Sequence, residues 1–80
     1  MRTISEVSEL DMKITVFYWN NKYILKFEKG MYEQTYKISE MDIGKEEDIN
    51  KIITNTNFLN DVRERFKNMN TILNEALNKL

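Results

Sequence analysis

Apolar and polar residues alternate along the first half of the chain, in two runs that meet at Asn20-Asn21. Residues 12–19 and 22–28 are rich in β-branched and aromatic residues, which is typical of strands. The two asparagines favour a two-residue turn, because Asn tolerates the positive φ angle that such a turn needs. Pairing through this turn sets the following residues opposite one another: Trp19 and Lys22, Tyr18 and Tyr23, Phe17 and Ile24, Val16 and Leu25, Thr15 and Lys26, Ile14 and Phe27, and Lys13 and Glu28.

A second two-residue turn is predicted at Lys29-Gly30, followed by a third strand over residues 31–38. This register sets Phe27 opposite Tyr32 and places the polar Gln34 among apolar residues. Gln34 has three readings: a buried hydrogen bond, a strand edge, or an error in the register after the second turn. The outcome is a three-stranded antiparallel meander over residues 12–38.

The two faces of the predicted meander differ in chemistry, because successive side chains of a strand point to opposite sides. One side, here called the aromatic face, is expected to form the core. Its members are Ile14, Val16, Tyr18, Tyr23, Leu25, Phe27, Tyr32, Gln34, Tyr36 and Ile38. The other side, here called the mixed face, carries Lys13, Thr15, Phe17, Trp19, Lys22, Ile24, Lys26, Glu28, Met31, Glu33, Thr35 and Lys37.

Residues 1–11 give no single pattern. Ile4, Val7 and Leu10 recur at every third position, which fits one or two helical turns, a frayed tail or a short added strand. We expect either a tail or a short element here.

The second half of the chain has helical periodicity. After an acidic connector (residues 39–48), a short helix is predicted over residues 45–54, and cap-forming residues at 54–57 begin a long helix over residues 57–79. Its apolar residues follow a heptad spacing: Leu59, Val62, Phe66, Met69, Leu73, Ala76 and Leu80. The pattern therefore predicts a single α+β domain over residues 1–80, with the long amphipathic helix packed on the aromatic face.

Length decides how the long helix is covered. A helix of about 22 residues spans about 33 Å, whereas a strand of about seven residues spans about 23 Å. Roughly a third of the helix should therefore extend past the sheet. The overhanging apolar residues are Ile72, Leu73, Ala76, Leu77 and Leu80. We expect them to contact a second copy of the chain in a homodimer.

The composition limits which catalytic and metal-binding sites the chain can form. The 80 residues include 12 basic and 13 acidic ones, a net charge of −1, and neither Cys nor His. His-dependent catalytic triads and thiolate metal sites are therefore excluded, and no glycine-rich phosphate loop is present. Carboxylates of the connector, such as Glu40 and Asp42, fit a solvated segment better than a metal or acid–base site. We expect no enzyme, no cofactor and no metal site. With no apolar run long enough for a signal peptide or a membrane span, we expect a cytoplasmic protein.

The mixed face is the candidate site for function. Aromatic and apolar residues lie among lysines there: Phe17, Trp19, Lys22, Ile24, Lys26 and Met31. The favoured hypothesis is a small interaction module, such as an adaptor, assembly or inhibitor protein, that binds an unknown protein partner. The alternative is weak binding of single-stranded nucleic acid, in which bases stack on the aromatic rings and lysines meet phosphates. A third reading makes the face a passive surface.

Overall fold

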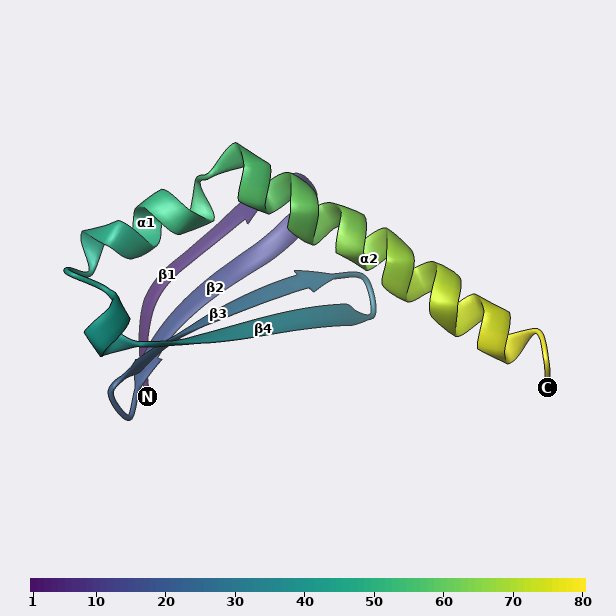
Figure 1. Cartoon of the computed structure of the whole chain (residues 1–80), viewed down its shortest axis with the longest axis horizontal. Helices are drawn as coiled ribbons and strands as arrows, with labels where there is room; N and C mark the ends of the chain where they lie inside the picture. The colour runs from purple at the N-terminus through teal and green to yellow at the C-terminus, as the bar shows by residue number, and fades with distance from the viewer.

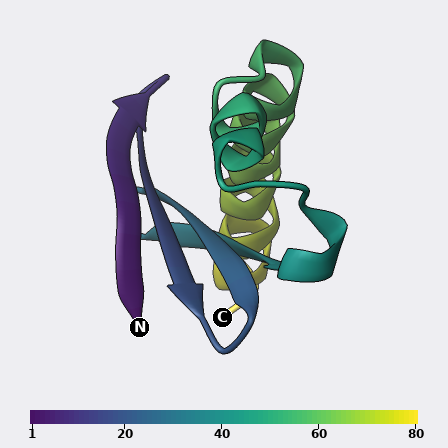
Figure 2. The ribbon, with the colours of Figure 1, turned by 90° about the vertical axis from the view of Figure 1, so that its left-hand side faces the viewer.

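The computed structural model describes all of residues 1–80 and contains one four-stranded antiparallel sheet with two α-helices on one side of it (Figures 1 and 2). The strands follow one another in space in the order β1-β2-β3-β4. Each strand has eight residues, and two-residue loops join them: β1 Arg2–Glu9, β2 Met12–Trp19, β3 Lys22–Lys29 and β4 Tyr32–Ser39. The sheet is thus a ten-residue unit repeated along the chain, which makes every connection a tight hairpin.

The hairpin between β2 and β3 confirms the predicted register. Asn20 and Asn21 form the loop with φ angles of 54° and 62°, the positive values that a type I′ turn requires. All seven cross-strand pairs expected from Trp19–Lys22 to Lys13–Glu28 are present. Local turn chemistry and the burial pattern agree at this point of the chain, so the faces are assigned correctly.

The prediction of three strands is wrong, because residues 2–9 form a fourth strand at the edge of the sheet. Leu10 and Asp11 form a second loop with two positive φ angles, which directs the chain back along β2. A β-bulge between Thr3 and Ser5 inserts Ile4 as an extra residue in the ladder. Ile4 and Leu10 both pack against the core. Because Ile4 lies in the bulge and Leu10 lies in the loop, the apolar residues of this segment recur at every third position. This spacing hid the alternation that is typical of a strand.

The predicted register of the third hairpin is also wrong, by two residues. The loop is Gly30-Met31, and the positive φ of 59° falls on Gly30 at the first loop position. A turn with Gly first is the type II′ arrangement, which no other residue type adopts as readily. Leu25 consequently lies opposite Tyr36, and Phe27 opposite Gln34. Because the shift is an even number of residues, both faces keep the members expected of the three strands, apart from Met31, which lies in the loop.

The helices begin and end close to the expected positions. A short 3-10 helix, η1 (Glu40–Asp42), follows the sheet, and α1 (Glu47–Ile53) and α2 (Thr56–Leu77) complete the chain. Asn55 caps α2, since its side-chain oxygen accepts a hydrogen bond from the Phe58 amide at 3.1 Å. The core lies between the aromatic face and the helices and consists of Met12, Ile14, Val16, Tyr23, Leu25, Phe27, Ile49, Ile53, Leu59, Val62 and Phe66.

Gln34 connects the edge strand β4 to the long helix α2 through a hydrogen bond. Its side chain is buried and donates a hydrogen bond of 2.9 Å to the backbone carbonyl of Val62 in α2. The Tyr36 hydroxyl donates a hydrogen bond to the side-chain oxygen of Gln34 at 3.0 Å. The structure therefore confirms the first reading of Gln34, a buried hydrogen bond. It also shows that β4 is an edge strand and that its register differs from the predicted one.

The distal part of α2 extends beyond the sheet, as the comparison of lengths predicted. Buried residues of α2 end at Phe66, and every residue from 70 to 80 is exposed. The overhang gives the molecule an elongated outline of 46 × 25 × 19 Å (Figure 1). Neither α1 nor the N-terminal strand reaches this end.

Candidate functional site

Four of the six residues singled out on the mixed face lie together at one end of the uncovered side of the sheet. Phe17 pairs with Ile24 across β2 and β3, and Trp19 pairs with Lys22 one step closer to the turn. The Lys22 ammonium lies 5.6 Å from the centroid of the Trp19 ring, a cation–π contact. Trp19 remains 49% exposed, whereas Ile24 is buried at 8%, contrary to its expected place on an exposed surface. We call Phe17, Trp19, Lys22 and Ile24 the open-face patch.

Lys26 and Met31 differ from the open-face patch in their surroundings. Lys26 continues the same face, but its ammonium lies 3.9 Å from the Glu28 carboxylate and 3.7 Å from the Glu33 carboxylate. Met31 is in the third loop, at the opposite end of β3 from Trp19, and its side chain is 99% exposed. The structure therefore does not bring Met31 together with the patch.

A second uncovered surface is the apolar side of the overhanging helix. The five residues expected there are all exposed, and we call them the distal stripe: Ile72, Leu73, Ala76, Leu77 and Leu80. They continue the periodicity of Leu59, Val62 and Phe66, which face the sheet in the first part of α2. The helix thus has one apolar side, of which only the first part is covered.

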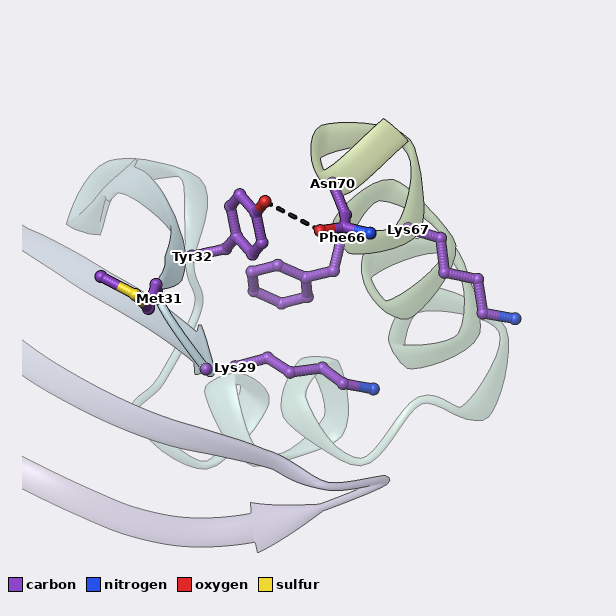
Figure 3. Close-up of a pocket in the computed structure, with 7 residues that line it drawn as sticks. Lys29, Met31, Tyr32, Phe66, Lys67 and Asn70 are labelled. Atoms are coloured by element: carbon purple, nitrogen blue, oxygen red, sulfur yellow. Dashed lines mark hydrogen bonds between the residues drawn. The ribbon is translucent and has the colours of Figure 1, made fainter. Parts of the chain in front are cut away.

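A cavity of about 490 Å³ opens where α2 leaves the sheet. It lies between the β3–β4 loop and the helix and is lined by Lys29, Met31, Tyr32, Phe66, Lys67 and Asn70 (Figure 3). The Tyr32 hydroxyl donates a hydrogen bond of 3.0 Å to the Asn70 side-chain oxygen across one side of it. No sequence pattern predicts this cavity, because its position depends on where the helix crosses the third hairpin.

The carboxylates of the acidic connector have separate partners. Glu46 forms an ion pair with Arg2 at 3.1 Å, and Asp48 forms one with Lys51 at 3.4 Å. Glu40 accepts a hydrogen bond of 2.5 Å from the Tyr18 hydroxyl, and this bond, helped by burial and by the Glu40 charge, raises the pKa of Tyr18 above its ordinary value of 10.0. No group of three or more acidic side chains is placed to hold a metal ion.

Comparison of the chain with models of known families, with curated proteins and with solved structures gives no match. None of its helices combines the length and the apolar character that a membrane span needs. The open-face patch, the distal stripe and the cavity are therefore the candidate functional sites of the chain.

Proposed function

We propose that the chain is a small non-enzymatic interaction module that forms a homodimer through the distal stripe and binds a protein partner through the open-face patch. The observation that carries the proposal is the exposure of the distal stripe. A contiguous row of apolar residues on a helix that no other element covers is characteristic of an interaction surface. We further propose the cytoplasm as its compartment, which a chain without cysteine suits.

The distribution of charge along α2 supports the role of its distal part in association. Residues 56–67 include five charged side chains, Asp61, Arg63, Glu64, Arg65 and Lys67. The thirteen residues from 68 to 80 include only two, Glu75 and Lys79, and these have opposite signs. Depletion of charge distinguishes the centre of an interface from the rest of a protein surface. A second copy would meet few like charges when it approaches this end.

The open-face patch supports binding of a protein more than binding of nucleic acid. Trp19 offers a large, half-exposed ring, the type of residue enriched at the centres of interfaces. Two of the lysines that could meet phosphates are already engaged with carboxylates. Lys26 lies between Glu28 and Glu33, and Lys13 lies 3.3 Å from Glu6.

Sedimentation equilibrium tests the homodimer. We expect the 9.7 kDa chain to sediment at twice its monomer mass as concentration rises, and we expect Leu73→Glu to remain monomeric. Thr71→Glu is the matched control, because it introduces the same charge on the side of the helix that faces away from the distal stripe. A wild-type chain that stays monomeric at hundreds of micromolar would contradict the proposal.

Capture of a protein partner tests the open-face patch. Trp19→Ala should abolish capture of a specific partner from a lysate, whereas Met31→Ala, at the far end of the sheet, should leave it intact. Quenching of Trp19 fluorescence by a single-stranded oligonucleotide, weakening as salt rises, would instead support the nucleic-acid alternative.

A further inference from the structure

We infer that the partner of the open-face patch presents an acidic, extended segment, whose carboxylates pair with Lys22 and Lys37 while an apolar side chain lies against the Trp19 ring. This inference rests on the proposed binding of a protein partner through the patch. It adds the chemistry of that partner and a further contact residue, Lys37. The observation that leads to it is the distribution of charge along the uncovered side of the sheet.

Lys37 lies at the same end of the mixed face as the open-face patch. Strand pairing sets Lys37 opposite Ile24 and sets Ser39 opposite Lys22. The helices lie on the other side of the sheet, so no helix covers this end of the mixed face (Figure 2). Ile24 is nevertheless buried, because its neighbours on the sheet, Phe17 and Lys37, flank it on both sides. Lys37 itself is exposed and extends the patch onto β4.

The charges of the mixed face are divided between its two ends. Two cross-strand rows at the end with the patch contain lysine and no carboxylate: Trp19, Lys22 and Ser39 form one, and Thr3, Phe17, Ile24 and Lys37 form the other. The carboxylates of this face all lie toward the opposite end: Glu6, Glu28 and Glu33. There, Lys13 and Lys26 are engaged in ion pairs. Because Lys22 and Lys37 have no such partner, the patch carries uncompensated positive charge in a chain of net charge −1.

The spacing of the two free lysines matches that of two carboxylates in an extended chain. Lys22 lies opposite Ser39, so Lys37 is its diagonal neighbour on the same face, at a Cα separation of about 7–8 Å. Alternate residues of an extended segment point to the same side and lie about 7 Å apart, at about 3.3–3.4 Å per residue. Two acidic residues separated by one other residue can therefore meet both ammonium groups at once.

Trp19 supplies the apolar part of the contact. Its ring is half exposed and lies 5.6 Å from the Lys22 ammonium. In an extended segment, an apolar residue two positions beyond the acidic residue at Lys22 points to the same side and reaches the ring. This contact is needed for affinity, since exposed ion pairs contribute little by themselves. The charges mainly select which segment binds.

The same features favour an acidic peptide over a nucleic acid. A single-stranded nucleic acid is bound by a track of basic side chains along its backbone and by several stacking rings. The mixed face has only two lysines free of carboxylates, and its carboxylates would repel phosphates at the other end. Trp19 is its one exposed ring, since Phe17 is only partly exposed.

Titration with short synthetic peptides tests the inference, and the fluorescence of Trp19, the single tryptophan of the chain, is the readout. The acidic probe has glutamate at its first and third positions, leucine at its fifth, and serine between them. Two matched peptides replace both glutamates by glutamine or by lysine. We expect the acidic peptide to bind about fivefold more tightly than the glutamine peptide, and we expect this difference to decrease as salt rises.

Variants of the lysines show whether the preference arises at the patch. Lys22→Gln and Lys37→Gln should each weaken binding of the acidic peptide by about two- to fivefold. Lys13→Gln is the matched control, because it makes the same change on the same face at a lysine already paired with Glu6, and it should weaken binding by less than about twofold. A chain with both Lys22→Glu and Lys37→Glu should prefer the lysine peptide. Circular dichroism shows whether each variant is folded.

The outcomes separate this inference from the proposed function. A preference for the acidic peptide that both lysine variants reduce and the control does not supports the inference. Equal binding of the acidic and glutamine peptides overturns the inference and leaves the proposed function standing. The same conclusion follows if no peptide binds while Trp19→Ala still abolishes capture of a protein partner. A chain that binds no peptide and captures no protein overturns both, as does one that binds a thymidine oligonucleotide more tightly than the acidic peptide.

Discussion

The two parts of α2 have the same periodicity but different surroundings. Residues 56–70 lie along the sheet and bury Leu59, Val62 and Phe66, whereas residues 71–80 extend beyond it and are exposed. An isolated helical segment of this length is marginal in water, because most helical stability in proteins comes from packing of the apolar side. The two parts show that the spacing of apolar residues identifies which side of a helix is suited to packing. The lengths of the other elements determine how much of that side they cover.

The largest expected effect compares two leucines of the same helix. Leu59 is 5% exposed and Leu77 is 51% exposed. Leu59→Ala should lower the free energy of unfolding by about 2–5 kcal/mol, because it leaves a cavity under the helix. Leu77→Ala should change it by no more than about 0.5 kcal/mol in the dilute monomer. Urea unfolding at low protein concentration measures both, and equal losses would show that the distal stripe is already covered within one chain.

The next effect concerns the hydrogen bond that anchors the first part of α2. Gln34→Ala leaves the Tyr36 hydroxyl and the Val62 carbonyl without their buried partner. We expect a loss of about 1–3 kcal/mol in the free energy of unfolding. Thr35→Ala, at the neighbouring exposed position of β4, is the control and should cost about 0.5 kcal/mol or less. If Gln34→Ala lowers the free energy of unfolding no more than the control does, the hydrogen bond between Gln34 and Val62 does not stabilise the helix.

A smaller effect on stability is expected at the β3–β4 loop, which lies where α2 leaves the sheet. Gly30 has a φ of 59°, and an added Cβ would meet no atom within 4 Å. Gly30→Ala should therefore lower stability by about 1 kcal/mol through backbone strain alone. Met31→Ala, at the next loop position, should leave the stability of the monomer unchanged. Chemical unfolding of both variants measures the difference, and an unaffected Gly30→Ala would argue against the positive φ angle.

The smallest effect lies at the other end of the sheet and depends on pH. Because the hydrogen bond to Glu40 raises the pKa of Tyr18 in the folded chain, its stabilisation is present below the unfolded pKa of about 10 and is lost as pH rises through the folded pKa. Glu40→Gln should return the Tyr18 pKa toward 10. Phenolate absorbance, with Tyr18→Phe subtracted, measures the shift. An identical titration in Glu40→Gln and wild type would contradict the assignment.

The parts of the fold that local chemistry determines could be predicted from the sequence. Asn20-Asn21 fixed one register, and Asn55 marked the start of α2. The fourth strand was only one of three open readings of residues 1–11, because the bulge at Ile4 and the loop at Leu10-Asp11 disguise a period of two as a period of three. The third register was misplaced because the position of Gly30 within its loop depends on turn type, which neighbouring residues alone do not determine.

The candidate site was predictable to a lesser extent. The open-face patch followed from the register of the second hairpin, and the distal stripe followed from helix length. Met31 was grouped with the patch by alternation, whereas its place in the third loop sets it beside the cavity. The cavity itself arises from the crossing of α2 over β3 and β4, a tertiary feature that sequence periodicity does not contain.

Amide hydrogen exchange at two protein concentrations tests the comparison most directly. Exchange reports local opening, and a segment held only by a second copy becomes protected as that copy binds. We predict that residues 71–80 exchange rapidly in the dilute chain and become protected as concentration rises, while residues 56–70 are protected equally at both concentrations. Distal amides whose exchange does not change with concentration, in a chain that remains folded, would contradict the account.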